Sequence, residues 1–397
     1  MLDTIFIGMS GLTGYSKGLR VIGNNLTNVN TPGFKGSQLQ FADLFYQGSA
    51  NTAGSGQAGG RAQLGMGLNT LATTINFKAG DLRQTGGGLD LAINGEGFFV
   101  LNDDGKSRYT RAGQFQFDND GFLVSTVNGL RVSGLDENGK LTDISLTGLQ
   151  SNPPKATTTV KFNGNISSNA ASDAVLNGIK VIDPAGGEHL IKMTFKNNSA
   201  TTMGNWTVTI SDDTGTLGTG TIQFSNGKPD GNASKIAFNY APTGIKPFSV
   251  MLDFSSDVTS FAAGNTSTIA VKSQDGVPAG AMTDVAFDAQ GALVVTYSNG
   301  QTANGTRLAL ARFNSTEDIV ALGGNEFGST NDAAVHLGYA KTNSFGSLSS
   351  GVVEGANVDL AEEFSNLIVM QRGYQAASHV ISTANELIEQ LYEMKGR

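Results

Sequence analysis

The sequence predicts a mainly β fold with paired long terminal α-helices, in which one domain is inserted within another. Apolar residues recur at three- and four-residue spacing near both ends of the chain, which is the period of a helix face. Between residues 70 and 356 the apolar residues alternate every second position instead. Glycine accounts for 53 of the 397 residues, close to twice the usual share of roughly 7%. Alternation and abundant glycine together indicate β structure rich in turns.

The first predicted helix has Asp3 as its N-cap and ends at residues 30–33 (NTPG). Its apolar seam, which we expect to contact other helices, comprises Leu2, Ile5, Met9, Leu12, Leu19, Ile22 and Leu26. Glycine interrupts it at Gly8, Gly11, Gly14, Gly18 and Gly23, at roughly 0.5–1 kcal/mol each relative to alanine. Because glycine also lets a second helix approach closely, we expect this segment to fold on assembly. A mobile terminus is the alternative.

The second predicted helix follows Asp359, which can cap it. Glu362 and Glu363 suit the positive end of its dipole, and Lys395 and Arg397 suit the negative end. Its seam comprises Leu360, Phe364, Leu367, Tyr374, Ala377, Ile381, Ala384, Ile388 and Leu391, with Gln371 at one seam position. We expect the two terminal helices to pair.

A glycine-rich stretch at residues 48–67 predicts a flexible or extended connection after the first helix. It contains a formal G-x-G-x-x-G at residues 54–59. No strand precedes this motif and no helical pattern follows it, so it does not predict a dinucleotide site.

Strands are predicted where apolar and polar residues alternate in the middle of the chain. Three such sets are Trp206, Val208 and Ile210; Phe248, Val250, Leu252 and Phe254; and Ile269 with Val271. The segment between two proline-bearing breaks, residues 152–155 and 277–280, has no helical pattern and predicts an all-β insertion.

Three similar turns occur in the β region, opening at Asp118, Asp136 and Asp288. In each, the aspartate is expected to accept backbone hydrogen bonds, and the glycine three residues later to take a positive φ and close a hairpin. Calcium ligation by Asp118 and Asp120 is the alternative, although the downstream ligands of such a loop are missing.

The predicted domains are nested and discontinuous, as in a building block with an inner core and an exposed tip. Residues 1–30 with 359–397 form a coiled-coil-like helical core, and residues 31–70 a connecting segment. Residues 71–150 with 281–358 form an inner β domain, and residues 151–280 an inserted outer β domain.

Composition argues against several classes of function. A formal charge of −8 with no basic cluster argues against nucleic acid or an anionic membrane as partner. The absence of cysteine excludes disulfides and thiolate sites, and the apolar runs are too short to cross a bilayer. The start of the chain lacks the pattern of a cleavable secretory signal.

No catalytic, cofactor or metal site is predicted. His189, His336 and His379 stand far apart, in no metal-ligand spacing, and are expected to be hydrogen-bonded or exposed. Neither a G-x-S-x-G elbow nor a phosphate-binding P-loop occurs, whereas a pair of carboxylates for glycoside hydrolysis stays open. We therefore predict that the chain is not an enzyme.

Three motifs resemble those of the bacterial flagellar rod and hook protein family. The first, at residues 24–35 (NNLTNVNTPGFK), resembles the family's N-terminal signature. The second is residues 90–99 (DLAINGEGFF), and the third runs from residue 357 to 376. The signature residues are Asn24, Asn25, Asn28, Asn30, Thr31, Pro32, Gly33, Phe34 and Lys35. The resemblance covers residues 1–150 and 280–397, and residues 155–280 only in architecture.

Within this family, the insertion favours a hook subunit, since a distal rod subunit would lack most of it. The resemblance implies a helical homopolymer that acts as a universal joint outside the cell. It also implies export through the flagellar type III apparatus without a cleaved signal. The implied partners are the flagellar rod, the hook cap and the hook–filament junction proteins. A distal rod subunit and a non-flagellar β-rich surface adhesin are the alternatives, although an adhesin should show a repeat period and a secretory signal.

The signature asparagines, Asn24, Asn25, Asn28 and Asn30, have two interpretations that stay open. They could fix the register between subunits by hydrogen bonds, or they could end the first helix as polar residues.

Overall fold

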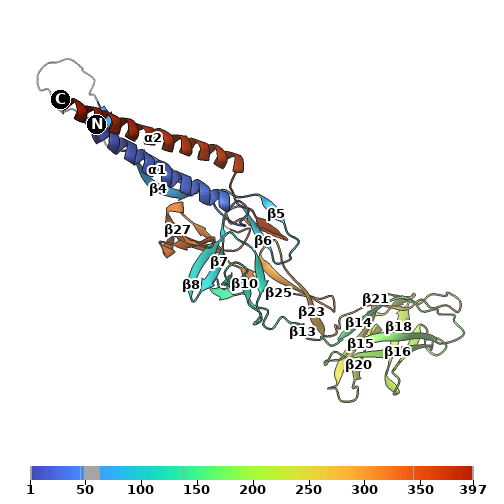
Figure 1. Cartoon of the computed structure of the whole chain (residues 1–397). Coiled ribbons are helices and arrows are strands. Elements are labelled where there is room, and N and C mark those ends of the chain that lie inside the picture. Colours follow the sequence, from blue (N-terminus) through green and yellow to red (C-terminus); the bar gives the residue numbers. More distant parts are fainter. Residues whose placement is uncertain (1, 45, 49–62, 137, 343, 396–397) are drawn as a thin grey trace, which may run out of the picture. The chain divides into compact units, whose positions relative to one another are not determined.

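The computed structural model describes residues 2–44, 46–48, 63–136, 138–342 and 344–395 (Figure 1). The chain divides into two compact units. Unit 1 comprises Met1–Leu146, Ala286–Val294 and Asn304–Arg397, and unit 2 comprises Thr147–Val285 and Val295–Ala303. Unit 1 takes in the segments predicted as helical core and connecting segment and most of the predicted inner β domain. Unit 2 contains the predicted outer domain, residues 151–280, together with residues 147–150, 281–285 and 295–303 of the predicted inner domain.

Two long helices of unit 1 pack side by side: α1, Leu2–Thr27, and α2, Leu360–Lys395 (Figure 1). The segment between them in the sequence consists mainly of strands, so the predicted fold class, mainly β with paired terminal helices, is confirmed. Asp359 caps α2 as predicted, because its Oδ1 accepts hydrogen bonds from the backbone N–H of Ala361 at 2.8 Å and of Glu362 at 3.2 Å. The prediction for Asp3 was wrong: the helix already begins at Leu2, so Asp3 lies inside the first turn, where it still suits the dipole.

A hairpin beside α1 occupies part of the predicted connecting segment. Strand β1, Ser37–Asp43, pairs antiparallel with β4, Leu68–Ile75, and β2, Tyr46–Gly48, pairs with β3, Gln63–Gly65. Regular structure therefore reaches further into the predicted connecting segment than its glycine content indicated. The G-x-G-x-x-G at residues 54–59 lies outside the described residues.

The β structure of unit 1 is built around β7, which pairs with β8, β11 and β26. Strands β5 and β6, from the first half of the chain, pair with β31 and β30 from the second half. The core includes fully buried Val100, Ala309 and Ala311. The strands are β5 Leu82–Gln84, β6 Leu91–Asn94, β7 Phe98–Asp103, β8 Lys106–Thr110, β9 Phe115–Phe117, β10 Leu123–Ser125, β11 Arg131–Leu135, β12 Leu141–Asp143, β26 Leu310–Phe313, β27 Ile319–Gly323, β28 Glu326–Ser329, β29 Val335–Gly338, β30 Ser347–Ser350 and β31 Val352–Glu354, with short 3-10 helices at Thr316–Asp318 and Asp332–Ala334.

Unit 2 contains a five-stranded sheet, in the order β15-β16-β17-β18-β19, and a four-stranded sheet, in the order β20-β21-β14-β22. The strands are β13 Ser151–Asn152, β14 Thr159–Asn165, β15 Ala174–Ile182, β16 Glu188–Asn197, β17 Asn205–Ser211, β18 Thr216–Ser225, β19 Lys228–Pro229, β20 Lys235–Tyr240, β21 Phe248–Thr259 and β22 Ala270–Gln274, with a 3-10 turn at Gly231–Ala233. Three of the four unit boundaries fall within strands: β23 Gly280–Phe287, β24 Ala292–Tyr297 and β25 Thr302–Leu308.

Alternation along the strands of unit 2 is largely confirmed by burial. In β17 and β21 the predicted inward positions are buried, apart from half-buried Phe248. The prediction for Val271 was wrong, because it is 37% exposed on β22, whereas Ile269 just before that strand is buried. Strand β22 lies at the edge of its sheet, and its register against β14 shifts at Phe162, so the alternation does not continue.

All three predicted aspartate turns are confirmed. The Oδ1 of Asp118 accepts hydrogen bonds from the backbone N–H of Asp120 at 3.0 Å and of Phe122 at 2.8 Å, and Gly121 has a φ of 81°. Asp136 and Asp288 repeat this arrangement. The side chain of Asp118 thus serves the turn itself, and the described residues contain no cluster of three potential metal ligands.

The two proline-bearing breaks lie side by side in unit 2. Lys155 and Val277 exchange two backbone hydrogen bonds of 2.9 Å, and β13 pairs with β23 just beyond them. The chain therefore enters and leaves the insertion as a pair of neighbouring strands.

Candidate assembly site

The two terminal helices approach each other closely because α1 presents glycine to α2. A Cβ atom at Gly8 would lie 2.6 Å from Cγ1 of Ile381, and one at Gly18 would lie 2.9 Å from the sulfur of Met370. Gly11 faces Ala377 in the same way, at 3.2 Å. A Cβ at any of these positions would have to displace its neighbour on α2, so the expectation of close helix approach is confirmed for these three glycines.

The other two glycines of α1 do not face α2. A Cβ atom at Gly14 would lie 2.5 Å from Cδ1 of Leu68, on hairpin strand β4, whereas one at Gly23 would meet nothing within 4 Å. Helix α1 therefore packs against α2 on one side and against the hairpin on another.

The predicted seam residues divide into two groups. Those buried or half-buried within unit 1 are Ile5, Leu12, Leu19, Ile22, Leu26, Leu367, Ala377, Ile381, Ala384 and Ile388. Those exposed are Met9, Leu360, Phe364, Tyr374 and Leu391. The side chain of Leu2 and residue Arg397 lie outside the described residues.

Further exposed apolar side chains on the helices were missed by the sequence reasoning. They are Phe6, Ile368, Val369, Val380, Leu387, Tyr392 and Met394. The prediction assigned one apolar seam to each helix, whereas α2 is apolar on more than one side. The sequence did show these additional apolar residues, and they are unusual because an amphipathic helix of a self-contained domain carries only one apolar stripe.

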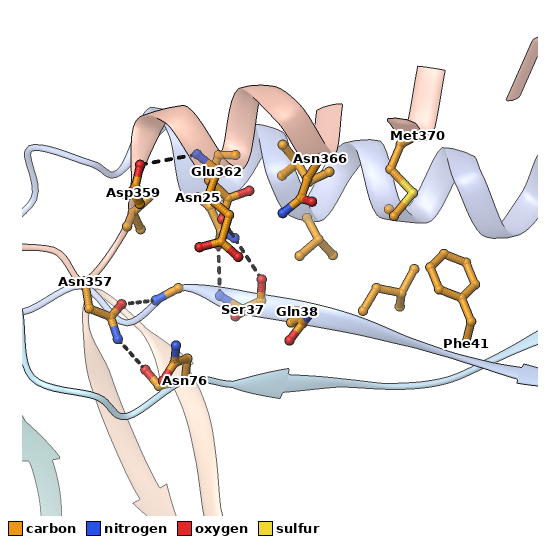
Figure 2. Close-up of a pocket in the computed structure, with 17 residues that line it drawn as sticks. Asn25, Ser37, Gln38, Phe41, Asn76, Asn357, Asp359, Glu362, Asn366 and Met370 are labelled. Carbon is orange, nitrogen blue, oxygen red and sulfur yellow. Dashed lines mark hydrogen bonds between the residues drawn. The ribbon is translucent and has the colours of Figure 1, made fainter. Parts of the chain in front are cut away.

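Asn25 of the signature joins three elements inside unit 1 (Figure 2). Its Nδ2 donates to the carbonyl of Ser37 on β1 and to Oε1 of Glu363 on α2, each at 2.8 Å, and its Oδ1 accepts from the N–H of Ser37 at 2.9 Å. Burial raises the pKa of Glu363, and the hydrogen bond from Asn25 opposes this shift. At 2% exposed, Asn25 has its hydrogen bonds within the subunit.

The neighbouring asparagines act at the end of α1. The Nδ2 of Asn28 donates to the carbonyl of Asn24 at 2.9 Å, and Thr31 donates its hydroxyl to Oδ1 of Asn28 at 3.2 Å. These contacts favour the helix-ending interpretation for Asn24 and Asn28. Asn30 is exposed.

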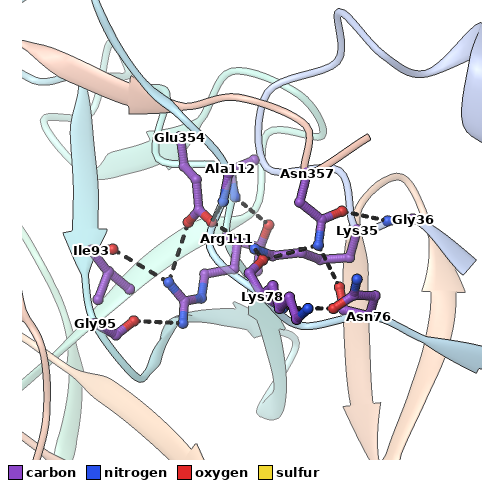
Figure 3. A network of polar contacts seen from close by, with 12 residues as sticks. Lys35, Gly36, Asn76, Lys78, Ile93, Gly95, Arg111, Ala112, Glu354 and Asn357 are labelled. Atoms are coloured by element: carbon purple, nitrogen blue, oxygen red, sulfur yellow. Dashed lines mark hydrogen bonds and ion pairs between the residues drawn. The ribbon is translucent and has the colours of Figure 1, made fainter. Parts of the chain in front are cut away.

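The signature ends in a buried ion cluster (Figure 3). Lys35 and Glu354 have side chains with 0% exposure, and Nζ of Lys35 donates to Oε1 of Glu354 at 2.6 Å. Arg111 Nη1 donates to the other carboxylate oxygen at 3.2 Å. Burial lowers the pKa of Lys35 and of Arg111, and the charge of Glu354 opposes both shifts. One carboxylate thus holds the signature, the inner β structure and the strand before α2 together.

The chain reaches this cluster through Gly33, which has a φ of 71° and donates its N–H to the carbonyl of Glu354 at 2.8 Å. A Cβ atom there would lie 2.4 Å from the backbone nitrogen of Ala112. The carbonyl of Pro32 accepts from Asn325 at 3.0 Å, and half-buried Phe34 follows. Only glycine fits this position, in both conformation and space.

A cavity of about 250 Å³ lies where α1, β1 and the first turns of α2 meet (Figure 2). Polar side chains dominate the α2 side, among them Asp359, Glu362 and Asn366. The three histidines stand apart from this cavity: His189 is hydrogen-bonded to Asp183 at 2.8 Å, and His336 and His379 are exposed, as predicted. No described helix is long and apolar enough to cross a membrane. The arrangement offers surfaces for packing rather than converging groups for catalysis.

Three segments of the chain match known family models. Residues 5–35 match the flagella basal body rod protein model, residues 92–168 the flagellar hook protein FlgE/F/G D1 domain, and residues 349–394 the flagellar basal body rod FlgEFG protein C-terminal model. The flagellar hook protein FlgE of Escherichia coli strain K12 is 30% identical over 414 residues, covering 98% of each protein. The chain belongs to the flagellar hook protein family.

Other members of the hook protein family are similar along the whole chain. The flagellar hook protein FlgE of Borreliella burgdorferi is 28% identical over 443 residues and covers 100% of both proteins. Because these alignments include the insertion at residues 151–280, the distal rod and adhesin alternatives are not favoured. The crystal structure of the Helicobacter pylori flagellar hook protein FlgE2 gives a TM-score of 0.45 at 13% identity, over 67% of this chain and 98% of that chain. Members of this family are structural proteins, and this chain is not an enzyme.

Proposed function

We propose that the chain is the structural subunit of a flagellar hook and that its copies polymerise into a curved, flexible tube that transmits torque from the rod to the filament. One observation supports self-assembly most strongly. Helices whose inner faces are already packed still expose large apolar side chains, including Phe6 at 53% and Phe364 at 51%. Apolar surface of this extent is typical of an interface awaiting a partner.

The terminal helices are the proposed assembly element, and residues 1–30 with 359–397 the proposed helical core. The five glycines of α1 weaken it as an isolated helix, and α2 fills the space beside three of them. A helix of this kind gains most of its stability from packing. Folding that is completed on assembly would keep the subunit exportable and slow its polymerisation inside the cell.

The β domains are the proposed stiff bodies of the hook, with residues 71–150 and 281–358 as the inner domain and 151–280 as the outer one. Bending then requires joints between bodies. The proposed joint is the pair of proline-bearing breaks at Lys155 and Val277. The glycine-rich stretch at residues 48–67, the other candidate from the sequence, runs between the paired strands β2 and β3, and its residues 49–62 lie outside the described residues.

Family membership also supports the finer proposals on location and partners. The chain would leave the cell through the flagellar type III export apparatus without a cleaved signal, and assemble outside the cell under a hook cap. It would then contact the rod at one end of the hook and the hook–filament junction proteins at the other.

Electron microscopy of the concentrated or salted-out protein tests the proposal. Curved tubes are the expected result. Straight tubes would favour the distal rod alternative, and a full-length chain that never polymerises would contradict the proposal. A chain that ends before Leu360 is the control, and it is expected to stay monomeric because it lacks α2.

A further inference from the structure

Helix α1 lines two neighbouring grooves of opposite charge. The groove on the α2 side lies where α1 and β1 meet the first turns of α2, and the groove on the hairpin side lies between α1 and strands β1 and β4. Val21, Ser37 and Leu39 line both. The first is the cavity of about 250 Å³ described above, and the second has a volume of about 500 Å³.

The groove on the α2 side is acidic (Figure 2). Asp359, Glu362 and Glu363, from the first turn of α2, line it, and no lysine or arginine is among its described lining residues. Glu363 is occupied by Asn25, and Asp359 caps the helix. Glu362 is exposed and forms no ion pair with any residue that the structure describes. Its charge is therefore available to a partner.

The groove on the hairpin side is basic. Lys17 and Arg20 of α1 line it together with Leu71 of β4, and none of its described lining residues is acidic. Lys17 donates to the hydroxyl of Thr70 at 2.9 Å, which holds its ammonium group beside the hairpin, and it forms no ion pair with a residue in the described part of the chain. Leu71 is 66% exposed, which adds apolar area to the groove.

We propose that the basic groove of one copy receives the acidic first turn of α2 from a second copy. This inference rests on the proposed function and names the surfaces that meet. Arg20 and Lys17 would pair with Glu362 of the neighbour, beside exposed Leu71 of the basic groove. Charge complementarity of this kind guides encounter and disfavours wrong registers.

The proposed contact joins two different surfaces of the chain, so it is a heterologous contact that can repeat head to tail. A head-to-tail contact leaves one groove free on each end copy, and repetition of it gives an open array. Since Gly18 lies beside Met370 and Asn25 beside Glu363, the acidic turn is level with the end of α1, beyond Arg20. Neighbouring copies would therefore be displaced along the helix axis, as a helical polymer requires.

Charge reversal in purified full-length protein tests the inference. The variant K17E/R20E makes both grooves acidic, and E362K weakens the acidic groove while leaving the Asp359 cap in place. Each alone is expected to polymerise about tenfold more slowly than wild type at low salt, because like charges then face each other. An equimolar mixture is expected to regain the wild-type rate, since every contact between unlike variants pairs opposite charges. Circular dichroism checks that both variants keep their helices.

Two matched reversals on α2 outside both grooves, R372E and E389K, are the controls and should leave the rate unchanged. Wild-type rates for K17E/R20E alone, or a mixture that stays as slow as its components, would overturn the inference. If the inference fails in this way but the wild-type protein still forms tubes, the proposed function is unaffected. Failure of the wild type itself to form tubes would instead contradict the proposed function.

Discussion

Unit 2 and the terminal helices bury their apolar side chains in different ways. In unit 2, Phe162 and Phe254 are fully buried and stack with their ring centroids 4.6 Å apart. On the helices, Phe6 and Phe364 remain more than half exposed. Unit 2 thus completes a core within a single chain, although Phe261 on its surface is 53% exposed, whereas exposed large apolar side chains recur along both terminal helices for further copies to cover. The difference indicates that a subunit of a polymer can separate the part that must be stable alone from the part that must join.

Removing a ring from the complete core should have the largest effect. Phe254→Ala is expected to lower the free energy of unfolding of unit 2 by about 4 kcal/mol, because it deletes a fully buried ring. Trp206, the single tryptophan, lies in the same core, so its fluorescence during urea denaturation measures the change. Met251→Ala on the same strand, at a side chain 40% exposed, is the control and should cost less than about 1 kcal/mol. Equal effects would contradict a complete core.

Breaking the buried ion cluster of unit 1 should have the next largest effect. Glu354→Gln leaves Lys35 and Arg111 buried without a counter-charge, so we expect unit 1 to lose about 3 kcal/mol of stability. Thermal unfolding followed by circular dichroism measures this loss. The control is Glu96→Gln, because that side chain is 73% exposed and its ion pair is loose at 3.8 Å, and it should change little. A stable Glu354→Gln protein would show that the cluster does not hold the junction.

Two glycines of α1 provide a smaller but more specific test of helix packing. Gly8→Ala should weaken the helix pair by about 1–2 kcal/mol, because the new methyl group would meet Ile381 at 2.6 Å. Gly23→Ala meets nothing within 4 Å and should strengthen α1 by about 0.5–1 kcal/mol through helix propensity alone. The minimum protein concentration for polymerisation should rise for the first variant and fall for the second. If both substitutions changed this concentration in the same direction, packing of α1 against α2 would not govern assembly.

The smallest expected effect is a dependence of unit 2 on pH. Burial raises the pKa of Asp183, but hydrogen bonds from His189 and from the backbone of Gly187 and Ala185 outweigh it, so the net pKa is lowered. A carboxyl with a lowered pKa stabilises the folded state above its unfolded pKa of about 3.9 and loses this contribution as pH falls through the folded pKa. Unit 2 should therefore become less stable below pH of about 4. In Asp183→Asn, the stability of unit 2, measured by Trp206 fluorescence, should therefore fall less steeply with decreasing pH in this range. An unchanged slope of stability against pH would exclude a contribution from Asp183.

Features with a local cause were predictable from the sequence. The cap at Asp359 and the turns at Asp118, Asp136 and Asp288 depend on side chains that bond to backbone a few residues away. A fourth turn of the same kind, at Asp183, was missed: it has proline at the second position, and at the third it has alanine where the other three turns have a polar side chain. The two helices were found because their spacing repeats over many residues.

The ion cluster could not be found in the same way. Glu354 stands 319 residues from Lys35 and 243 from Arg111, and no period connects positions so far apart. The signature offered a partial signal, since a lysine among apolar and glycine residues needs an acidic partner when it is buried. Which acid it meets is decided by the pairing of β5 with β31, which brings the two halves of the chain together.

Hydrogen exchange of each amide, compared between the monomer and the assembled tube, tests the central claim most directly. The account predicts that roughly the first and last 30 residues exchange fast in the monomer and are protected in the tube, because further copies cover their apolar side chains. Unit 2, represented by the amides around Phe254, should be protected equally in both states. Terminal helices that are equally protected before and after assembly would contradict the claim that they complete their core only with neighbouring copies.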